Sequence, residues 1–245
     1  MVDKPFVVLA SRYDSVARRF VRRYASRGAR LLTPDDLSRI GWYHRLGHPH
    51  SSTAVIAGRM TAARDITGVV IRLPYVGEQD LAHIIPADRS YVASEMSAFL
   101  LPWLLELSCP LLNRPTPHCL AGPYWRHEQW VQTAHRLGIS VFPMRRHIRF
   151  PDVVPQKPAP KGVTVTLVGQ RHIGTAEPGL VDQARALARA AGVDLLAVRF
   201  SSPAAGARFV EASLWPDIGN RAVGDSILEY LRGNVAPISR RQADR

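Results

Sequence analysis

The stretch Tyr91–Pro143 reads YVASEMSAFLLPWLLELSCPLLNRPTPHCLAGPYWRHEQWVQTAHRLGISVFP, and its pattern decides the fold that we predict. Apolar residues recur at helical spacing at Phe99, Trp103 and Leu107, which predicts a helix with Ser94 as its N-cap. A short strand, a turn, a second helix and another short strand follow. Helices that alternate with short apolar strands are typical of an α/β sheet.

Several residues within this stretch indicate where its elements begin and end. Proline lacks a backbone N–H, so Pro102 predicts a kink or a restart of the first helix. The other expected elements are the strand Leu111–Leu112, the turn Asn113-Arg114-Pro115, a helix over residues 125–137 closed by Gly138, and the strand Ile139–Phe142.

The chain before this stretch opens with a strand–helix–strand pattern. We expect a strand at Phe6–Ala10, a helix at Ser11–Ala25 and a strand at Arg30–Leu32, which together begin a parallel sheet. Two further apolar segments, Thr53–Ala57 and Val69–Leu73, are expected to form a hairpin or adjacent strands. No glycine-rich GxGxxG loop follows the first strand, which argues against a dinucleotide-binding dehydrogenase.

The composition changes after Pro143 and again after Lys161. Prolines at 151, 155, 158 and 160 indicate an extended connection, and strands at 162–169, 171–175, 195–200 and 207–212 with helices at 180–191 and around 227–231 follow it. We therefore predict an N-terminal α/β domain over residues 1–143, a Pro-rich linker over 144–161, a smaller C-terminal lobe over 162–233 and a polar tail over 234–245.

The overall composition is that of a globular protein with a basic charge. The 245 residues are 46% hydrophobic and carry a formal net charge of +12, which favours an anionic partner such as nucleic acid, a nucleotide or an acidic peptide. No apolar run has membrane-spanning length, and no signal-peptide pattern opens the chain, so we expect a cytoplasmic protein without a membrane partner. Cys109 and Cys119 are expected to be free thiols.

Several motifs resemble those of the ATP-grasp ligases, in particular the glutathione-synthetase-like and graspetide peptide-ligase groups. LLNRP, followed by a helix that ends in LGISVFP, resembles the close of the first domain in that family. Near the C-terminus, LARAAGVDLLAVRF, RFVEASLWPD and SILEYL resemble the helix and strand, the metal-binding strand and the closing helix. The resemblance implies a pre-ATP-grasp-like parallel-sheet lobe followed by a smaller α+β lobe.

The chain departs from the family at the residues that hold ATP and magnesium. By the resemblance, Glu211 matches the metal-binding glutamate, but Ser213 stands in place of the asparagine and Arg199 in place of the upstream aspartate. No lysine lies near Arg126 and His127, and residues 144–161 stand where the family has its large nucleotide-binding lid. We therefore expect a truncated form without a cofactor, and with ATP and magnesium only if some ligase activity remains.

These observations favour a degenerate ATP-grasp-like protein, a non-catalytic binding or accessory partner in peptide or natural-product modification. The alternatives are a minimal ATP-dependent carboxylate–amine ligase or other redirected enzyme, and a basic module that binds nucleic acid. The corresponding partners are a peptide or protein, an anionic small molecule, or nucleic acid.

A ligand in an open α/β sheet binds beyond the carboxyl ends of the strands. We predict a ligand site there because arginine grips a carboxylate with two parallel hydrogen bonds and tyrosine adds an aromatic wall. The alternative is that the arginines point into solvent or pair with Asp88 and Glu95. The candidate residues are Ser11, Arg12, Arg72, Tyr75, Arg89, Asn113 and Arg114.

Overall fold

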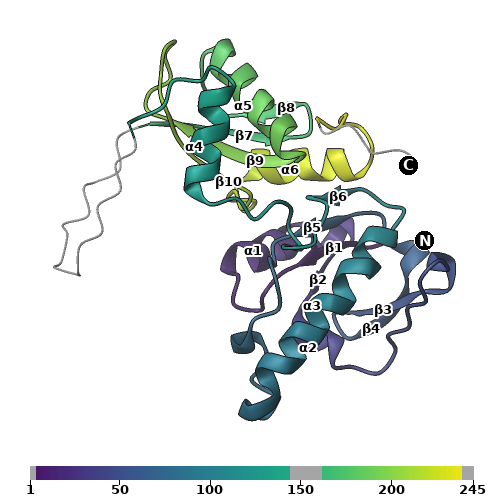
Figure 1. The fold of residues 1–245 in the computed structure, drawn as a ribbon. Helices are drawn as coiled ribbons and strands as arrows, with labels where there is room; N and C mark the ends of the chain where they lie inside the picture. The colour runs from purple at the N-terminus through teal and green to yellow at the C-terminus, as the bar shows by residue number, and fades with distance from the viewer. Residues whose placement is uncertain (1–3, 144–161, 239–245) are drawn as a thin grey trace.

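The computed structural model describes residues 4–143 and 162–238, which form two α/β lobes, one above the other in Figure 1. The first lobe holds a parallel sheet of four strands in the order β2-β1-β5-β6, and the second holds an antiparallel sheet in the order β10-β9-β7-β8. The predicted fold class, α/β with a parallel sheet in the first lobe, is confirmed. The strands are β1 Phe6–Leu9, β2 Ala29–Leu32, β5 Val69–Ile71, β6 Leu111–Leu112, β7 Val163–Val168, β8 Arg171–Ile173, β9 Leu195–Phe200 and β10 Phe209–Ser213.

Alternate residues of β1 face opposite sides of the parallel sheet, as the two-residue period of a strand requires. Val7 and Leu9 lie in a core that includes Trp103 of α3 (Arg89–Glu106). Phe6 and Val8 lie in a different core, with Phe20 of α1 (Ser15–Tyr24). Both faces of the sheet are therefore covered, which explains why all four residues of β1 are buried.

Helix α6 (Arg221–Leu231) lies between the two sheets and joins the lobes (Figure 1). Ile227 packs in one core with Phe20 of the first lobe and with Val168 and Leu195 of the second. The lobes thus share a continuous apolar core. The remaining helices are α2 (Pro34–Leu37), α4 (His127–Arg136) and α5 (Pro178–Ala191).

The second lobe includes residues from both sides of the predicted domain boundaries. Trp130 and Ala134 of α4 pack in the core of the antiparallel sheet with Phe200 and with α5, although residue 143 was expected to close the first domain. Ile238, from the predicted polar tail, is also buried in that core. The predicted linker, residues 144–161, lies outside the described residues.

Helix α3 differs from its prediction at both its start and its middle. It begins at Arg89, directly after a 3-10 turn at Pro86–Asp88, so Ser94 lies inside the helix and not at its N-cap. It also runs on through Pro102 without a restart. Trp103, Leu104 and Leu100 are all buried against the sheet, and this packing holds the helix on both sides of the proline.

Other predicted elements are also corrected by the structure. Helix α1 begins at Ser15 because the Asp14 side chain accepts a hydrogen bond from Ala17 N and caps it, so the predicted start at Ser11 is wrong. Residues 53–56 (β3) pair with Arg59–Ala62 (β4), and not with Val69–Ile71, which joins the main sheet beside β1. Positive φ angles at Ala57 and Gly58 form the tight hairpin turn that makes this pairing possible. Of the expected strand Ile139–Phe142, only an isolated bridge from Val141 to Phe209 is present.

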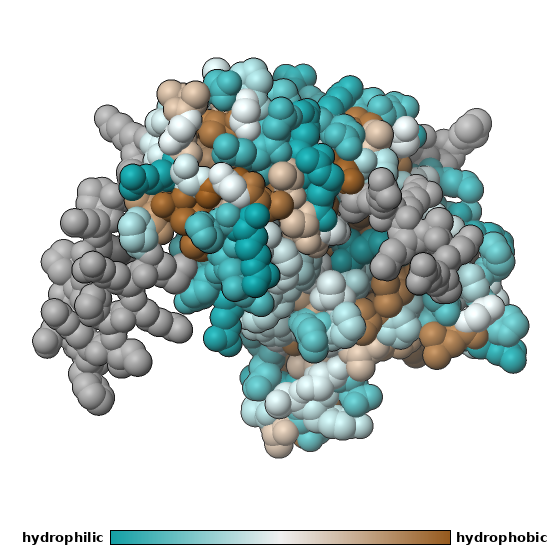
Figure 2. All heavy atoms as spheres, turned by 45° about the horizontal axis from the view of Figure 1, so that its top comes forward, coloured by the Kyte–Doolittle hydropathy of each residue, from teal (hydrophilic) through white to brown (hydrophobic). Residues whose placement is uncertain are grey.

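Figure 2 shows the face of the molecule that includes the top of Figure 1, coloured by hydropathy. Most of its described surface is hydrophilic, and the apolar residues form separate small patches. Monomeric proteins ordinarily expose apolar surface in this scattered way, so this face gives no indication of a large apolar docking surface.

Candidate functional site

The four strands of the first sheet run parallel, so their carboxyl ends lie at one edge of the sheet. This edge receives Ser11 and Arg12 after β1, Arg72 to Tyr75 after β5, and Asn113 and Arg114 after β6. The structure gives these residues different partners, and only some of them remain open to a ligand.

Arg72 is committed to the contact between the lobes. Its Nε lies 2.7 Å from Oδ2 of Asp14, and its Nη1 donates to the carbonyl oxygen of Pro216 at 2.9 Å. Only 8% of its side chain is exposed. The guanidinium therefore has internal acceptors, and it holds the cap of α1 against the second lobe.

Ser11 and Arg12 belong to a polar cluster beyond β1 and β2. The hydroxyl of Ser11 donates to Asp80, a buried carboxylate at the end of the 3-10 turn Glu78–Asp80. Nη1 of Arg12 lies 2.9 Å from Oδ2 of Asp35, and its guanidinium stands 5.2 Å from the ring centroid of Tyr13. Both residues thus bind carboxylates of the protein itself.

Arg89 holds a loop of the chain and does not reach the strand ends. Its Nε donates to the carbonyl oxygen of Ile84 at 2.9 Å, and its Nη2 donates to that of Ala82 at 3.3 Å. These two carbonyls flank His83. Neither Asp88 nor Glu95 pairs with the predicted arginines in the described part of the chain; Asp14 and Asp35 do.

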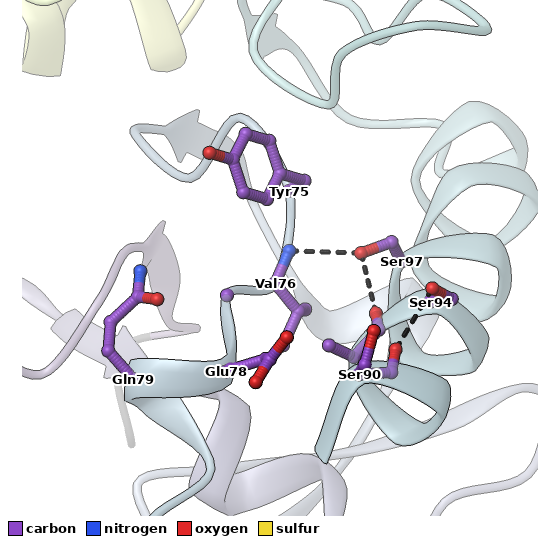
Figure 3. Close-up of a pocket in the computed structure, with 9 residues that line it drawn as sticks. Tyr75, Val76, Glu78, Gln79, Ser90, Ser94 and Ser97 are labelled. Atoms are coloured by element: carbon purple, nitrogen blue, oxygen red, sulfur yellow. Dashed lines mark hydrogen bonds between the residues drawn. The ribbon is translucent and has the colours of Figure 1, made fainter. Parts of the chain in front are cut away.

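Tyr75 lines an open hollow of about 550 Å³ between the loop after β5 and the first turns of α3 (Figure 3). The ring is 54% exposed. Ser97 Oγ accepts a hydrogen bond from Val76 N at 2.9 Å and donates to Ala93 O at 2.8 Å, so it fixes the loop to the helix. The lining residues are Tyr75, Val76, Gly77, Glu78, Gln79, Ser90, Ala93, Ser94 and Ser97. The hollow thus offers an aromatic ring, hydroxyls, an amide and a single carboxylate.

Asn113 is only 2% exposed and bonds the second lobe directly. Its Nδ2 donates to Leu195 O at 2.9 Å, and its Oδ1 accepts from Asp194 N at 2.9 Å and Leu195 N at 2.7 Å. The side-chain amide therefore binds both backbone groups of Leu195, as a neighbouring strand would.

Arg114, the next residue, is exposed at a larger cavity of about 970 Å³ between the lobes. Arg189 and Cys109 also line this cavity. Burial raises the pKa of the Cys109 thiol to about 11, although the Arg114 charge opposes that rise. Cys109 and Cys119 are free thiols, as predicted.

Glu211, the candidate metal ligand, pairs with Arg199 across the strands β10 and β9. The two residues are register partners, and Nε of Arg199 lies 3.0 Å from Oε1 of Glu211. Within the described residues, no three His, Cys, Asp or Glu side chains are grouped so that they could hold a metal ion. No helix in the described ranges is long and apolar enough to cross a membrane.

Comparison with known proteins gives the fold a family context. No family model matches the sequence, and no curated protein matches it. Solved structures do match. A RiPP-associated ATP-grasp ligase of Chryseobacterium gregarium, in complex with ADP and a leader and core peptide, is 13% identical with a TM-score of 0.65, over 98% of this chain and 100% of that chain.

Two further solved structures are similar over most of both chains. The macrocyclase MdnC of Microcystis aeruginosa, bound with the precursor peptide MdnA, has 13% identity and a TM-score of 0.63, over 93% of this chain and 99% of that chain. The ATP-grasp ligase PsnB, complexed with the precursor peptide PsnA2 and AMPPNP, has 14% identity and a TM-score of 0.60, over 96% and 98%. At these identities the likeness establishes the fold, which is that of the ATP-grasp ligases.

Several polar residues at the carboxyl edge have little signal in the sequence. Asp35 lies in a sequence pattern typical of a helix start, and Asp80, Ser38 and His83 stand in no recognisable motif. Asp80 approaches Ser11 across 69 positions of sequence, a contact that the tertiary fold alone creates. Among these residues, only Asp35 and Ser38 stand at a helical spacing, three positions apart, that the local sequence shows.

Proposed function

We propose that this chain has the ATP-grasp fold but is non-catalytic as a ligase, and that it binds a peptide and acts as an accessory partner in peptide modification. The observation that carries the proposal is the ion pair between Arg199 and Glu211, 3.0 Å apart across β9 and β10. In the resembled family these two positions carry carboxylates that hold magnesium. Here Arg199 places a permanent positive charge at one of these positions, and this charge neutralises the carboxylate of Glu211 at the other.

The charge at this position opposes the binding of magnesium and ATP. Magnesium takes oxygen ligands in an octahedral shell and is usually bound through carboxylates and substrate phosphates. A guanidinium at 3.0 Å from Glu211 repels a divalent ion and occupies the carboxylate. Residues 144–161 also stand where the resembled family carries its lid, so we propose that the chain uses neither ATP nor magnesium.

Peptide binding is proposed for the hollow beside Tyr75. The similar solved ligases are described with a leader and core peptide or a precursor peptide bound. The hollow of this chain has the chemistry for an extended peptide: the half-exposed Tyr75 ring gives a stacking face, and Ser90, Ser94 and Gln79 give donors and acceptors. Glu78 is the one ionisable carboxylate in its lining.

Isothermal titration with ATP, with and without magnesium chloride, tests the first half of the proposal. We expect no heat of binding at micromolar protein under either condition. Tight binding that requires magnesium would contradict the proposal and favour the minimal ligase instead.

An array of short random-sequence peptides tests the second half. We expect some peptides to retain the protein at high salt, because binding in this hollow rests on stacking and hydrogen bonds rather than on the basic surface. Tyr75→Ala should abolish that retention. Tyr91→Ala removes a tyrosine that is more exposed, at 69%, but does not line the hollow, and it should leave retention unchanged. Equal effects of the two variants would place the peptide elsewhere.

A further inference from the structure

Three side chains beyond β2 stand in the order hydroxyl, imidazole and carboxylate. Ser38 Oγ lies 2.8 Å from Nε2 of His83. Nδ1 of the same ring lies 3.1 Å from Oδ1 of Asp35. This is the order of groups that activates a serine nucleophile, and it is recognised by geometry and not by sequence position.

Helix α2 and the hydrogen bonds of Arg89 position these three residues. Asp35 and Ser38 lie one turn apart, because Asp35 is in α2 and Ser38 is the residue that ends it. His83 comes from a distant loop, and Arg89 donates to the carbonyls on both sides of it, at Ala82 and Ile84. Arg89, a predicted ligand residue, therefore holds the backbone that carries the imidazole.

The carboxylate of Asp35 is itself fixed. Nη1 of Arg12 lies 2.9 Å from Oδ2, which leaves Oδ1 as the oxygen nearer to His83. Oδ1 is buried and makes no hydrogen bond among the described residues, although Nδ1 of His83 lies 3.1 Å from it. A proton on Nδ1 that is turned toward Oδ1 would satisfy this oxygen, and Nε2 is then the acceptor that faces the Ser38 hydroxyl.

A second Ser–His–carboxylate group in the same lobe provides a contrast. His44 Nδ1 lies 3.1 Å from Ser52 Oγ, and its Nε2 lies 3.8 Å from Oε2 of Glu106. Ser52 is only 2% exposed, so no substrate reaches its hydroxyl. Ser38 is exposed. The two groups have similar residue types but opposite access.

We propose that Ser38 is an activated nucleophile, with His83 as its general base and Asp35 as the residue that positions His83, and that it takes the acyl group of small, unhindered carboxylic esters. Ser38 Oγ attacks the carbonyl carbon while its proton passes to Nε2 of His83. The bond to the leaving alcohol breaks, and the alcohol oxygen receives that proton. Water then attacks the acyl-serine, again giving its proton to Nε2, and the carboxylic acid and free serine are released.

Two backbone donors follow the nucleophile in the sequence. The N–H groups of Ile40 and Gly41, which follow Ser38 closely in sequence, have no acceptor within the described part of the chain. Donors of this kind stabilise the oxyanion that forms when a serine attacks a carbonyl. The side chain of Ile40 is fully exposed, so an ester reaches this turn without rearrangement of a core.

A fluorophosphonate probe tests the proposal on the full chain. The probe forms a bond from serine oxygen to phosphorus and releases fluoride with the serine proton, and peptide mapping by mass spectrometry shows which serine reacts. We expect a single adduct at Ser38 in the unmodified protein and none at Ser52. This first measurement needs no variant and so does not depend on the folding of one.

Variants then test the role of each residue. His83→Ala should slow labelling of Ser38 at least about 100-fold, the usual contribution of a general base. Asp35→Ala should slow it as well, and Asp35→Glu should restore part of the rate, which a merely structural loss would not show. Ser51→Ala is the matched control, since Ser51 is an exposed serine whose hydroxyl donates to His48 O at 2.9 Å and touches no imidazole.

The rates at which the variants hydrolyse p-nitrophenyl acetate should rank in the same order as their labelling rates. Ser38→Ala should hydrolyse this ester no faster than buffer alone. Labelling spread over many serines would overturn the proposal. So would labelling of Ser38 at an unchanged rate in His83→Ala, because the reactivity would then come from exposure alone.

Discussion

Replacing Asn113 by alanine tests how the lobes are held together. The Asn113 side chain crosses between the lobes with three hydrogen bonds, to Leu195 N, Leu195 O and Asp194 N, at 2.7 to 2.9 Å. Strand β10 pairs with β9 only from Phe200 to Ala197, so Leu195 has no strand partner from β10. The asparagine amide takes that place.

The size of the effect follows from the groups that the substitution leaves unpaired. Each neutral hydrogen bond contributes about 1 kcal/mol net, and a buried backbone group left without a partner costs about 1–3 kcal/mol. Asn113 is 2% exposed, so water does not reach these groups unless the interface opens. We expect Asn113→Ala to lower the free energy of unfolding by about 3–5 kcal/mol, a large part of the 5–15 kcal/mol that holds an ordinary domain together.

Urea denaturation followed by far-ultraviolet circular dichroism measures this loss as a lower midpoint. Asn234→Ala is the control, because Asn234 is exposed and its side chain bonds Glu229, at 2.8 Å, on the surface of the same lobe. That variant should stay within about 0.5 kcal/mol of the parent. A loss below about 1 kcal/mol for Asn113→Ala would refute the view that this amide ties the lobes.

Three further predictions concern other parts of the chain. Arg199→Asp places a carboxylate opposite Glu211, and we expect weak calcium binding on the order of 1 mM, measured by terbium luminescence and competition, where the parent shows none. Gly224→Ala should destabilise by about 1–3 kcal/mol in thermal melts, since its Cβ would lie 2.5 Å from Tyr24 Oη, whereas the same change in an exposed helix stabilises. Cys109, with its pKa raised to about 11, should react with iodoacetamide far more slowly at pH 8 than free glutathione, and faster as the pH approaches 11; equal rates at pH 8 would contradict its burial.

The parts of the fold that follow from local pattern could be predicted from sequence. The opening β-α-β unit is an example, because apolar periodicity and Gly28 in a left-handed conformation mark its elements and their ends. Thr33 and Pro34 likewise begin a helix with a capping box, as their residue types predict. The packing partner of a helix depends on tertiary contacts and could not be predicted from local pattern. Helix α4 packs on the second sheet through Trp130, although the chain reaches it from the first lobe.

At the candidate site, too, the location of the residues along the strands could be predicted from sequence, but their contacts could not. Arg72 and Asn113 follow strands whose carboxyl ends lie at one edge of the sheet, as parallel strands require, whereas Arg89 follows no strand. Their partners were not predictable. Asp14 lies 58 positions from Arg72 and Leu195 lies 82 positions from Asn113, and neither distance has a local signal.

The packing of the second lobe explains which part of this edge remains open to a ligand. In an open α/β sheet the space beyond the strand ends is the ligand crevice. Here Pro216 and Leu195 of the second lobe meet the ends of β5 and β6, where Arg72 and Asn113 bind them. From the sequence these two side chains were candidates for binding a ligand. In the structure they bind the second lobe instead. The edge that stays accessible lies to either side, at the hollow beside Tyr75 and at the exposed hydroxyl of Ser38. Because Ser97 fixes the loop at the hollow and Arg89 holds the loop that carries His83, a ligand at either place would meet a preformed surface and would cost little reorganisation.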